Sequence, residues 1–146
     1  MTVKSAKVFG HGLEVITRFK ATGSFIRRYG AYINDGTPLN NYVELTLKDD
    51  KREDPIISQA ALKALEIMTD AQYKILYDLN VQIATIIKND FSERGLDLYD
   101  IKLEFGYVDA PENIVLIDEI SGGNMRVYKD GEILDPVELA QFFIEL

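Results

Sequence analysis

The stretch DIKLEFG, residues 100–106, alternates charged and apolar side chains. Its charged residues are Asp100, Lys102 and Glu104, and the residues between them are apolar. Successive side chains of a β-strand point to opposite faces, so the pattern predicts a strand with one apolar face and a row of two acids and a base on the other. Solvent on the outer face of an antiparallel sheet would explain such a row. A functional site is the alternative explanation.

The composition limits the classes of protein to which the chain can belong. Its 146 residues carry 24 acidic and 16 basic side chains, a formal net charge of -8, and 47% hydrophobic residues. This content predicts one compact domain over residues 1–146, and the acidity argues against nucleic acid and acidic membranes as partners. There is no cysteine, which excludes disulfides, thiolate catalysis and cysteine-bound zinc. No apolar run reaches membrane-spanning length, so we expect a cytoplasmic protein.

The periodicity predicts an α+β fold, with helices packed on one face of an antiparallel sheet. Strands are expected over residues 13–19, 42–48, 96–106 and 114–120, and helices over 58–67, 69–94 and from 136 onwards. Thr69 and Gln72 fit a capping box at the start of the long helix, and Gly95 fits its end. The apolar stripe expected to be buried on this helix consists of Leu76, Leu79, Ile83, Ile86 and Ile87.

Several short signals predict turns and caps. Ser24 is a candidate cap for a short segment that follows a Thr-Gly-Ser turn. The dipeptide Asp130-Gly131 predicts a hairpin, and Asp135 is expected to cap the last helix. The Gly122-Gly123 pair fits either an ordinary tight turn or a loop that lets backbone and Arg126 approach a phosphate.

A hairpin between residues 96–106 and 114–120 brings two acids together. With Pro111 near the centre of the loop, antiparallel pairing predicts that Glu104 faces Asp118. Two carboxylates directly opposite each other repel, and Mg²⁺ would relieve that repulsion by binding one or two carboxylates together with waters and substrate phosphates. A solvated acidic pair remains the alternative.

Four stretches of the chain closely resemble motifs of the SAICAR synthetase family. They are LEVITRFKATGS (13–24), KDDKREDPII (48–57), DIKLEFG (100–106) and LIDEISGGNMRVY (116–128), and they occur in the family's order. The resemblance implies an ATP- and Mg²⁺-dependent ligase of purine biosynthesis. Such an enzyme joins L-aspartate to a carboxylated phosphoribosyl aminoimidazole, and its substrate carboxylate is activated by phosphorylation.

The resemblance also implies roles for individual residues. It implies that Glu104 and Asp118 bind the metal and that Arg18, Ser24 and Arg126 bind the ribonucleotide phosphate. It implies that Asp100 and Lys102 lie at the reacting end of the substrate. It also implies nucleotide-side or substrate-side contacts for Lys48, Asp54 and Glu14. The sequence departs from the family at Gly122-Gly123, where Pro-Asp is usual, and at Phe19, where Asn is usual.

Family members begin with a β-rich lobe that covers the ATP, and this sequence starts just before the first matched strand. We therefore expect the lobe to come from a second copy or a partner subunit, with apolar surface exposed near Leu13 and Val15. Two hypotheses follow. The chain is a ligase that needs a second chain or lobe, or it is a non-catalytic or divergent module that binds and regulates purine ribonucleotides.

Overall fold

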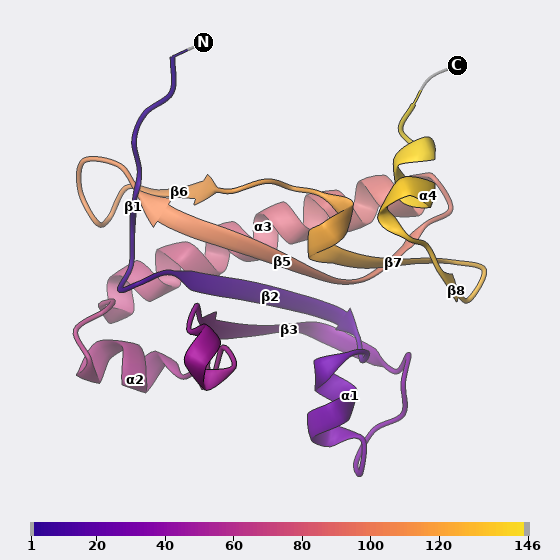
Figure 1. Ribbon diagram of the computed structural model, residues 1–146, viewed down its shortest axis with the longest axis horizontal. Helices are drawn as coiled ribbons and strands as arrows, with labels where there is room; N and C mark the ends of the chain where they lie inside the picture. The colour runs from indigo at the N-terminus through magenta and orange to yellow at the C-terminus, as the bar shows by residue number, and fades with distance from the viewer. Residues whose placement is uncertain (1, 145–146) are drawn as a thin grey trace. The chain divides into compact units, whose positions relative to one another are not determined.

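The computed structural model describes residues 2–144 (Figure 1). The strands are β1 (Lys7–Val8), β2 (Leu13–Lys20), β3 (Pro38–Leu47), β4 (Ile56–Ile57), β5 (Asp97–Tyr107), β6 (Ile114–Ile117), β7 (Met125–Lys129) and β8 (Glu132–Ile133). The α-helices are α1 (Ser24–Tyr29), α2 (Gln59–Ala64), α3 (Asp70–Glu93) and α4 (Pro136–Gln141), and the 3-10 turns are η1 (Asp50–Arg52) and η2 (Gly122–Asn124). Within residues 2–144, no helix is both long and apolar enough to cross a bilayer.

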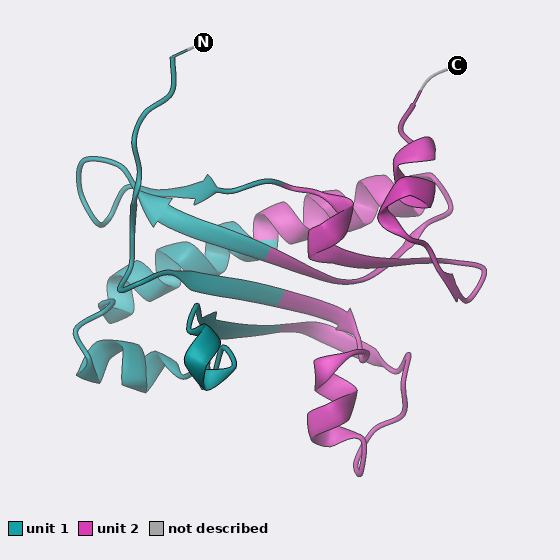
Figure 2. Ribbon diagram, viewed as in Figure 1, with its two compact units in different colours: residues 1–16, 43–81, 103–119 teal, residues 17–42, 82–102, 120–146 magenta. Residues whose placement is uncertain are grey.

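The chain divides into two compact units (Figure 2). Unit 1 comprises residues 1–16, 43–81 and 103–119, and unit 2 comprises residues 17–42, 82–102 and 120–146. Three strands, β2, β3 and β5, and the long helix α3 each contribute one segment to both units.

The strands pair in the order β4-β3-β2-β5-β7-β8, and β1 and β6 also pair with β5. The pairs β1–β5, β3–β4, β5–β6, β5–β7 and β7–β8 are antiparallel. Helix α3 is the longest of the described helices (Figure 1). The α+β fold with an antiparallel sheet is therefore confirmed.

Local sequence signals place both ends of α3 and the start of α4 correctly. The Thr69 hydroxyl accepts a hydrogen bond from the Gln72 amide at 3.1 Å, and the Gln72 side chain accepts one from the Thr69 amide at 3.0 Å. This capping box starts α3, and Gly95, with φ of 75°, follows its end. Asp135 and Glu138 form the second capping box, at α4. The Asp130-Gly131 turn joins β7 to β8 as predicted.

The buried face of α3 differs from the predicted stripe. Leu76 is fully buried, but Ile86 is 68% exposed, so its assignment to the core is wrong. The other fully buried positions of the helix are Asn80 and Ala84. Residues four apart lie on one helix face, and Asn80 within that face interrupts the apolar pattern from which the stripe was predicted.

The predicted register of the β5–β6 hairpin is wrong by one residue. Glu104 pairs with Ile117, not with Asp118. The loop closes between Val108 and Asn113, whose amide and carbonyl are 3.1 Å apart, so its centre lies just before Pro111 and not at it. Strand β6 ends at Ile117, and Asp118 has a left-handed backbone with φ of 61°.

A β-bulge lies in β5 where it pairs with β7. Leu98 pairs with Val127 and Asp100 with Arg126, so the register shifts by one residue between them. Leu98 and Ile101 are both 1% exposed, although they are three residues apart. The extra residue, Tyr99, therefore lies on the same face as Asp100.

Two other expectations are corrected by the burial and capping of β2 and α1. Leu13 and Val15 are 2% and 0% exposed, because they belong to the core, so the argument for self-association from their exposure is wrong. Ser24 makes no capping hydrogen bond, and the cap position of α1 is Gly23. Phe19 is also buried, and its ring lies under the Lys88 ammonium at 4.8 Å.

The glycine pair of the 121–126 loop has a packing role. A Cβ on Gly122 would lie 3.0 Å from both Cα and Cβ of Pro136, so a larger residue would require η2 and α4 to move apart by a few tenths of an ångström. This contact accounts for Gly122 as a structural turn residue, and the approach of Arg126 to a phosphate stays a prediction.

Candidate functional site

Unit 2 contains a buried cluster built around Arg18 of β2. Arg18 is 1% exposed, and its Nη1 donates to Asp100 Oδ2 at 3.2 Å and to the Thr22 carbonyl at 3.3 Å. Its Nη2 donates to Ser24 Oγ at 2.7 Å. The Phe25 ring lies 5.6 Å from the guanidinium. Strand β2 and the turn that follows it are thus joined by one arginine side chain.

Arg126 of β7 brings a second guanidinium to the same carboxylate. Its Nη1 donates to Asp100 Oδ2 at 2.8 Å, and its side chain is 39% exposed. The pairing of β5 with β7 places Arg126 directly opposite Asp100. Arg18 therefore forms the buried side of the cluster, and Arg126 forms the side that a ligand in solution can reach.

Asp100 is the shared acceptor of this cluster. Burial raises the pKa of its carboxyl, and the charges of Arg126 and then Arg18 oppose that rise. Two guanidinium groups and one carboxylate carry a net positive charge when Asp100 is ionised, which suits a phosphate. Lys102, the other residue expected at the reacting end of the substrate, is half-buried two residues further along β5.

An aromatic pair borders the arginine cluster. The rings of Tyr99 and Tyr128 stack with centroids 3.7 Å apart, and the Lys20 ammonium lies 5.1 Å from the Tyr99 ring. Lys20 also forms an ion pair with Asp97, and the Tyr128 hydroxyl lies 3.4 Å from Thr22 Oγ1. Sequence reasoning missed this pair because the bulge, which brings Tyr99 to this face, has no signature in the sequence.

Unit 1 contains the second cluster, in which Lys48 Nζ lies 3.0 Å from Glu104 Oε1. The pKa of Lys48 is raised mainly by its hydrogen bond to Glu104, and also by the charges of Glu14 and Asp118. Asp118 therefore lies close enough to Lys48 for its charge to act on that ammonium, although it is not the strand partner of Glu104. Asp118 follows the end of β6 and has a left-handed backbone, so the alternation of strand side chains does not fix the direction of its carboxylate.

Asp54 has a structural role in the loop after β3. Its Oδ1 accepts a hydrogen bond from the Asp49 amide at 2.8 Å, and the Asp49 side chain in turn accepts one from the Arg52 amide at 3.2 Å. The backbone of Asp54 is left-handed, with φ of 48°. The charged run at 49–54 is therefore an ordered turn.

The acids of unit 1 fit a magnesium nucleotide better than a metal held by protein alone. Within the described residues, no group of three or more acids and histidines could hold a metal ion. Mg²⁺ commonly uses one or two carboxylates and completes its shell with waters and phosphates. Glu104 and Asp118 are the two carboxylates for which the sequence predicts this role.

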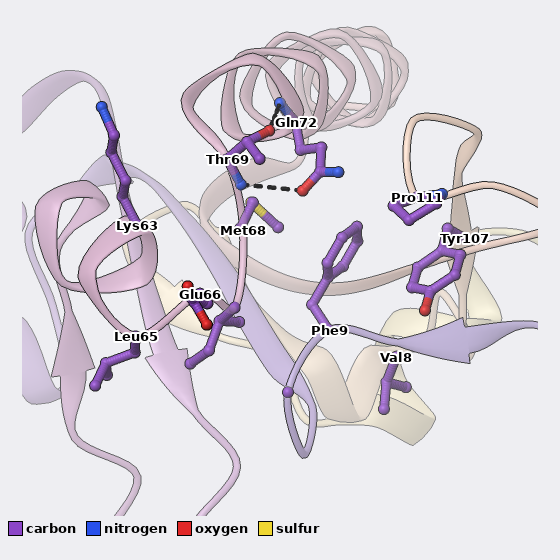
Figure 3. A pocket seen from close by; sticks show the side chains of 12 residues that line it. Val8, Phe9, Lys63, Leu65, Glu66, Met68, Thr69, Gln72, Tyr107 and Pro111 are labelled. Atoms are coloured by element: carbon purple, nitrogen blue, oxygen red, sulfur yellow. Dashed lines mark hydrogen bonds between the residues drawn. The ribbon is translucent and has the colours of Figure 1, made fainter.

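Unit 1 also contains a pocket of about 690 Å³ that is separate from this cluster (Figure 3). Phe9, Met68 and Tyr107 point into it, and the capping box of α3 lies at its rim. Tyr107 and Glu104 are three residues apart on β5, so their side chains point to opposite faces of the strand. The pocket therefore lies on the face away from the acids.

Known proteins share the sequence pattern and the fold of this chain. The sequence model of the SAICAR synthetase family matches residues 1–138. The chain belongs to the SAICAR synthetase family. It is 55% identical to the phosphoribosylaminoimidazole-succinocarboxamide synthase of Clostridium tetani over 145 residues, which cover 99% of this chain and 64% of that protein.

Solved structures of SAICAR synthetases have the same fold. The enzyme from Ehrlichia chaffeensis matches with a TM-score of 0.84 and 29% identity, over 97% of this chain and 60% of that one. A SAICAR synthetase solved in complex with ADP matches with a TM-score of 0.77 and 31% identity, over 92% of this chain and 57% of that one. This chain thus spans about three fifths of the length of these relatives.

Proposed function

We propose that the chain provides binding sites for an ATP-dependent ligase that joins L-aspartate to a carboxylated phosphoribosyl aminoimidazole. Membership of the SAICAR synthetase family supports this function, as does the ADP complex of one member. Because the chain spans 64% of its Clostridium tetani relative, the activity of the whole enzyme is part of the proposal. Association of the chain with itself or with a partner subunit is also part of it.

The arginine cluster of unit 2 carries the proposal. A phosphate monoester is recognised best by charge-assisted hydrogen bonds from guanidinium groups held in fixed positions. Asp100 accepts a hydrogen bond from Arg126 and so holds its partly exposed guanidinium in place. Arg18 Nη2 donates to Ser24 Oγ at 2.7 Å and so holds the Ser24 hydroxyl. We assign the ribonucleotide phosphate to Arg126 and Ser24, with Arg18 as the buried support.

The acids of unit 1 would hold the magnesium nucleotide. Bound Mg²⁺ would neutralise charge on the phosphoryl group that is transferred to the substrate carboxylate. Glu104 and Asp118 provide oxygen ligands, and Lys48 keeps a positive charge beside them because its pKa is raised. A carboxylate is a poor electrophile, and its phosphorylation creates the leaving group that the amine of L-aspartate displaces.

Calorimetric titration tests both sites separately. Magnesium ATP is expected to bind the native chain, and Glu104→Gln or Asp118→Asn should weaken that binding on the order of tenfold, which corresponds to about 1.4 kcal/mol. Glu93→Gln, an exposed acid of α3, is the matched control and should bind normally. Normal nucleotide binding by both site variants would refute the metal assignment.

The same titration distinguishes the ligase from a binding module. Binding of both magnesium ATP and the carboxylated ribonucleotide supports the ligase. Binding of the ribonucleotide alone supports the module that binds without ligation. Sedimentation of the same samples measures whether the chain associates with itself.

A further inference from the structure

We propose that Gly23 is a positioning residue of the phosphate site, because the guanidinium of Arg126 occupies the space that any other side chain at this position would need. This inference rests on the phosphate site proposed above. It adds Gly23 to that site. Gly23 has no side chain, so it acts on the ligand only through the position of Arg126.

The first observation is the close approach of Arg126 to the Gly23 backbone. A Cβ added to Gly23 would have Nη1, Cζ and Nη2 of Arg126 as its three nearest atoms, all within 3.0 Å. Real Cβ atoms essentially never approach other atoms so closely. The guanidinium therefore rests directly on the turn between β2 and α1.

The second observation is that the same guanidinium is held from its other side. Its Nη1 donates to Asp100 Oδ2 at 2.8 Å, and Asp100 is 4% exposed. Arg126 lies between a buried carboxylate and the bare backbone of Gly23. A methyl group at residue 23 would push the guanidinium away from Asp100 and out of the position in which it meets a phosphate.

The backbone of Gly23 is itself restricted to glycine, which the experiment has to take into account. Its φ of 60° and ψ of -129° lie in a region that residues with a side chain rarely adopt. Its carbonyl accepts hydrogen bonds from the amides of Ile26 and Arg27, both at 3.1 Å. An alanine at this position would therefore strain the turn as well as displace Arg126.

Gly95 is the matched control for that strain. It also has a positive φ, 75°, but a Cβ added there meets nothing within 4 Å. Gly95→Ala thus introduces backbone strain in unit 2 without displacing any side chain. It should leave ribonucleotide affinity within about twofold of the native value.

A double-mutant cycle between Gly23→Ala and Arg126→Ala tests the proposal. The probe is the carboxylated phosphoribosyl aminoimidazole, with its nucleoside as the phosphate-free control. Gly23→Ala should weaken ribonucleotide binding about tenfold in the native background and by a clearly smaller factor when Arg126 is already alanine, because only the strain of the turn that carries Ser24 then remains. An equal loss in both backgrounds, or an equal loss for the nucleoside, would show a structural role and overturn the proposal.

The same cycle measured by chemical unfolding does not depend on any ligand. If the clash with Arg126 matters, the double variant should be no less stable than Gly23→Ala alone, since removing the guanidinium removes the clash. A double variant less stable than Gly23→Ala would overturn the proposal. If the native chain binds no ribonucleotide, the proposed function fails, and the unfolding cycle still decides the role of Gly23.

Discussion

The two charged clusters of this chain differ most in their access to water. In unit 2, the side chains of Arg18 and Asp100 are 1% and 6% exposed. In unit 1, those of Lys48 and Glu104 are 45% and 14% exposed. Both clusters pair a base with an acid of β5, yet only the first is enclosed by protein.

This difference assigns different physical roles to the two clusters. Removing one partner of a buried ion pair leaves an uncompensated charge in a poorly solvated place, so the pair has to form whenever the chain folds. An exposed pair contributes little, and its partners can separate at low cost when a ligand arrives. We therefore expect the arginine cluster to be rigid before ligand binds and the Lys48–Glu104 pair to rearrange.

The largest effect is expected from Arg18→Ala. It deletes a buried side chain that bonds Asp100, Ser24 and the Thr22 carbonyl, and it should destabilise the fold by about 3 to 5 kcal/mol. Urea unfolding followed by circular dichroism measures this loss. A loss below about 1 kcal/mol would show that the cluster is no more important to folding than the exposed pair.

Arg126→Ala should act on binding more than on folding. Arg126 is partly exposed, and Asp100 keeps Arg18 as a partner after the change. Loss of a charge-assisted hydrogen bond to phosphate should cost about 1.5 to 3 kcal/mol, or roughly ten- to hundredfold in ribonucleotide affinity. Calorimetry with the ribonucleotide and its nucleoside checks this, since the nucleoside should lose little. An equal loss for both would mean that Arg126 supports structure.

Stability should depend on pH through Asp100. Burial raises the pKa of this carboxyl above 3.8, so between that value and the higher folded pKa the folded chain binds more protons than the unfolded one. The contribution of this group to stability is fully present below the unfolded pKa and is lost as pH rises through the folded pKa. Relative to Asp100→Asn, the native chain should therefore lose stability from about pH 4 upward. Unfolding of both proteins across this range measures the difference, and a rise with pH would contradict the expectation.

The smallest effect is expected from Lys48→Ala. Its ion pair with Glu104 is exposed, so the change should alter the free energy of unfolding by about 1 kcal/mol at most. Lys51→Ala, an exposed lysine in the next turn, serves as the control. A loss as large as that of Arg18→Ala would remove the distinction between the two clusters.

Features that depend on neighbouring residues could be predicted from the sequence. The capping boxes at Thr69 and Asp135, and the helix end at Gly95, need only residues within one turn of each other. The strand at 100–106 was predicted for the same reason, because alternation is a local pattern. The charged face of that strand does contribute Asp100 and Glu104 to the two candidate sites.

Features that depend on residues far apart in the sequence could not be predicted from local patterns. A shift of half a residue in the loop before Pro111 changed every pair of the β5–β6 hairpin. The contact of Arg18 with Asp100 joins residues 82 positions apart, and nothing local to either residue indicates the other. Ile86 of α3 is exposed although it was expected in the core, and Asn80 of the same helix is buried, so hydrophobicity alone does not fix the buried face.

The bulge at Tyr99 allows the length of β5 to vary without changing its inward-facing residues. If Tyr99 were deleted, Leu98 would directly precede Asp100, and the usual alternation would still direct Leu98 inward and Asp100 outward. The register with β7 would also become continuous, because the present shift equals one residue. Tyr99 is thus an added residue whose removal would spare the core and would take away one ring of the stack beside Arg126.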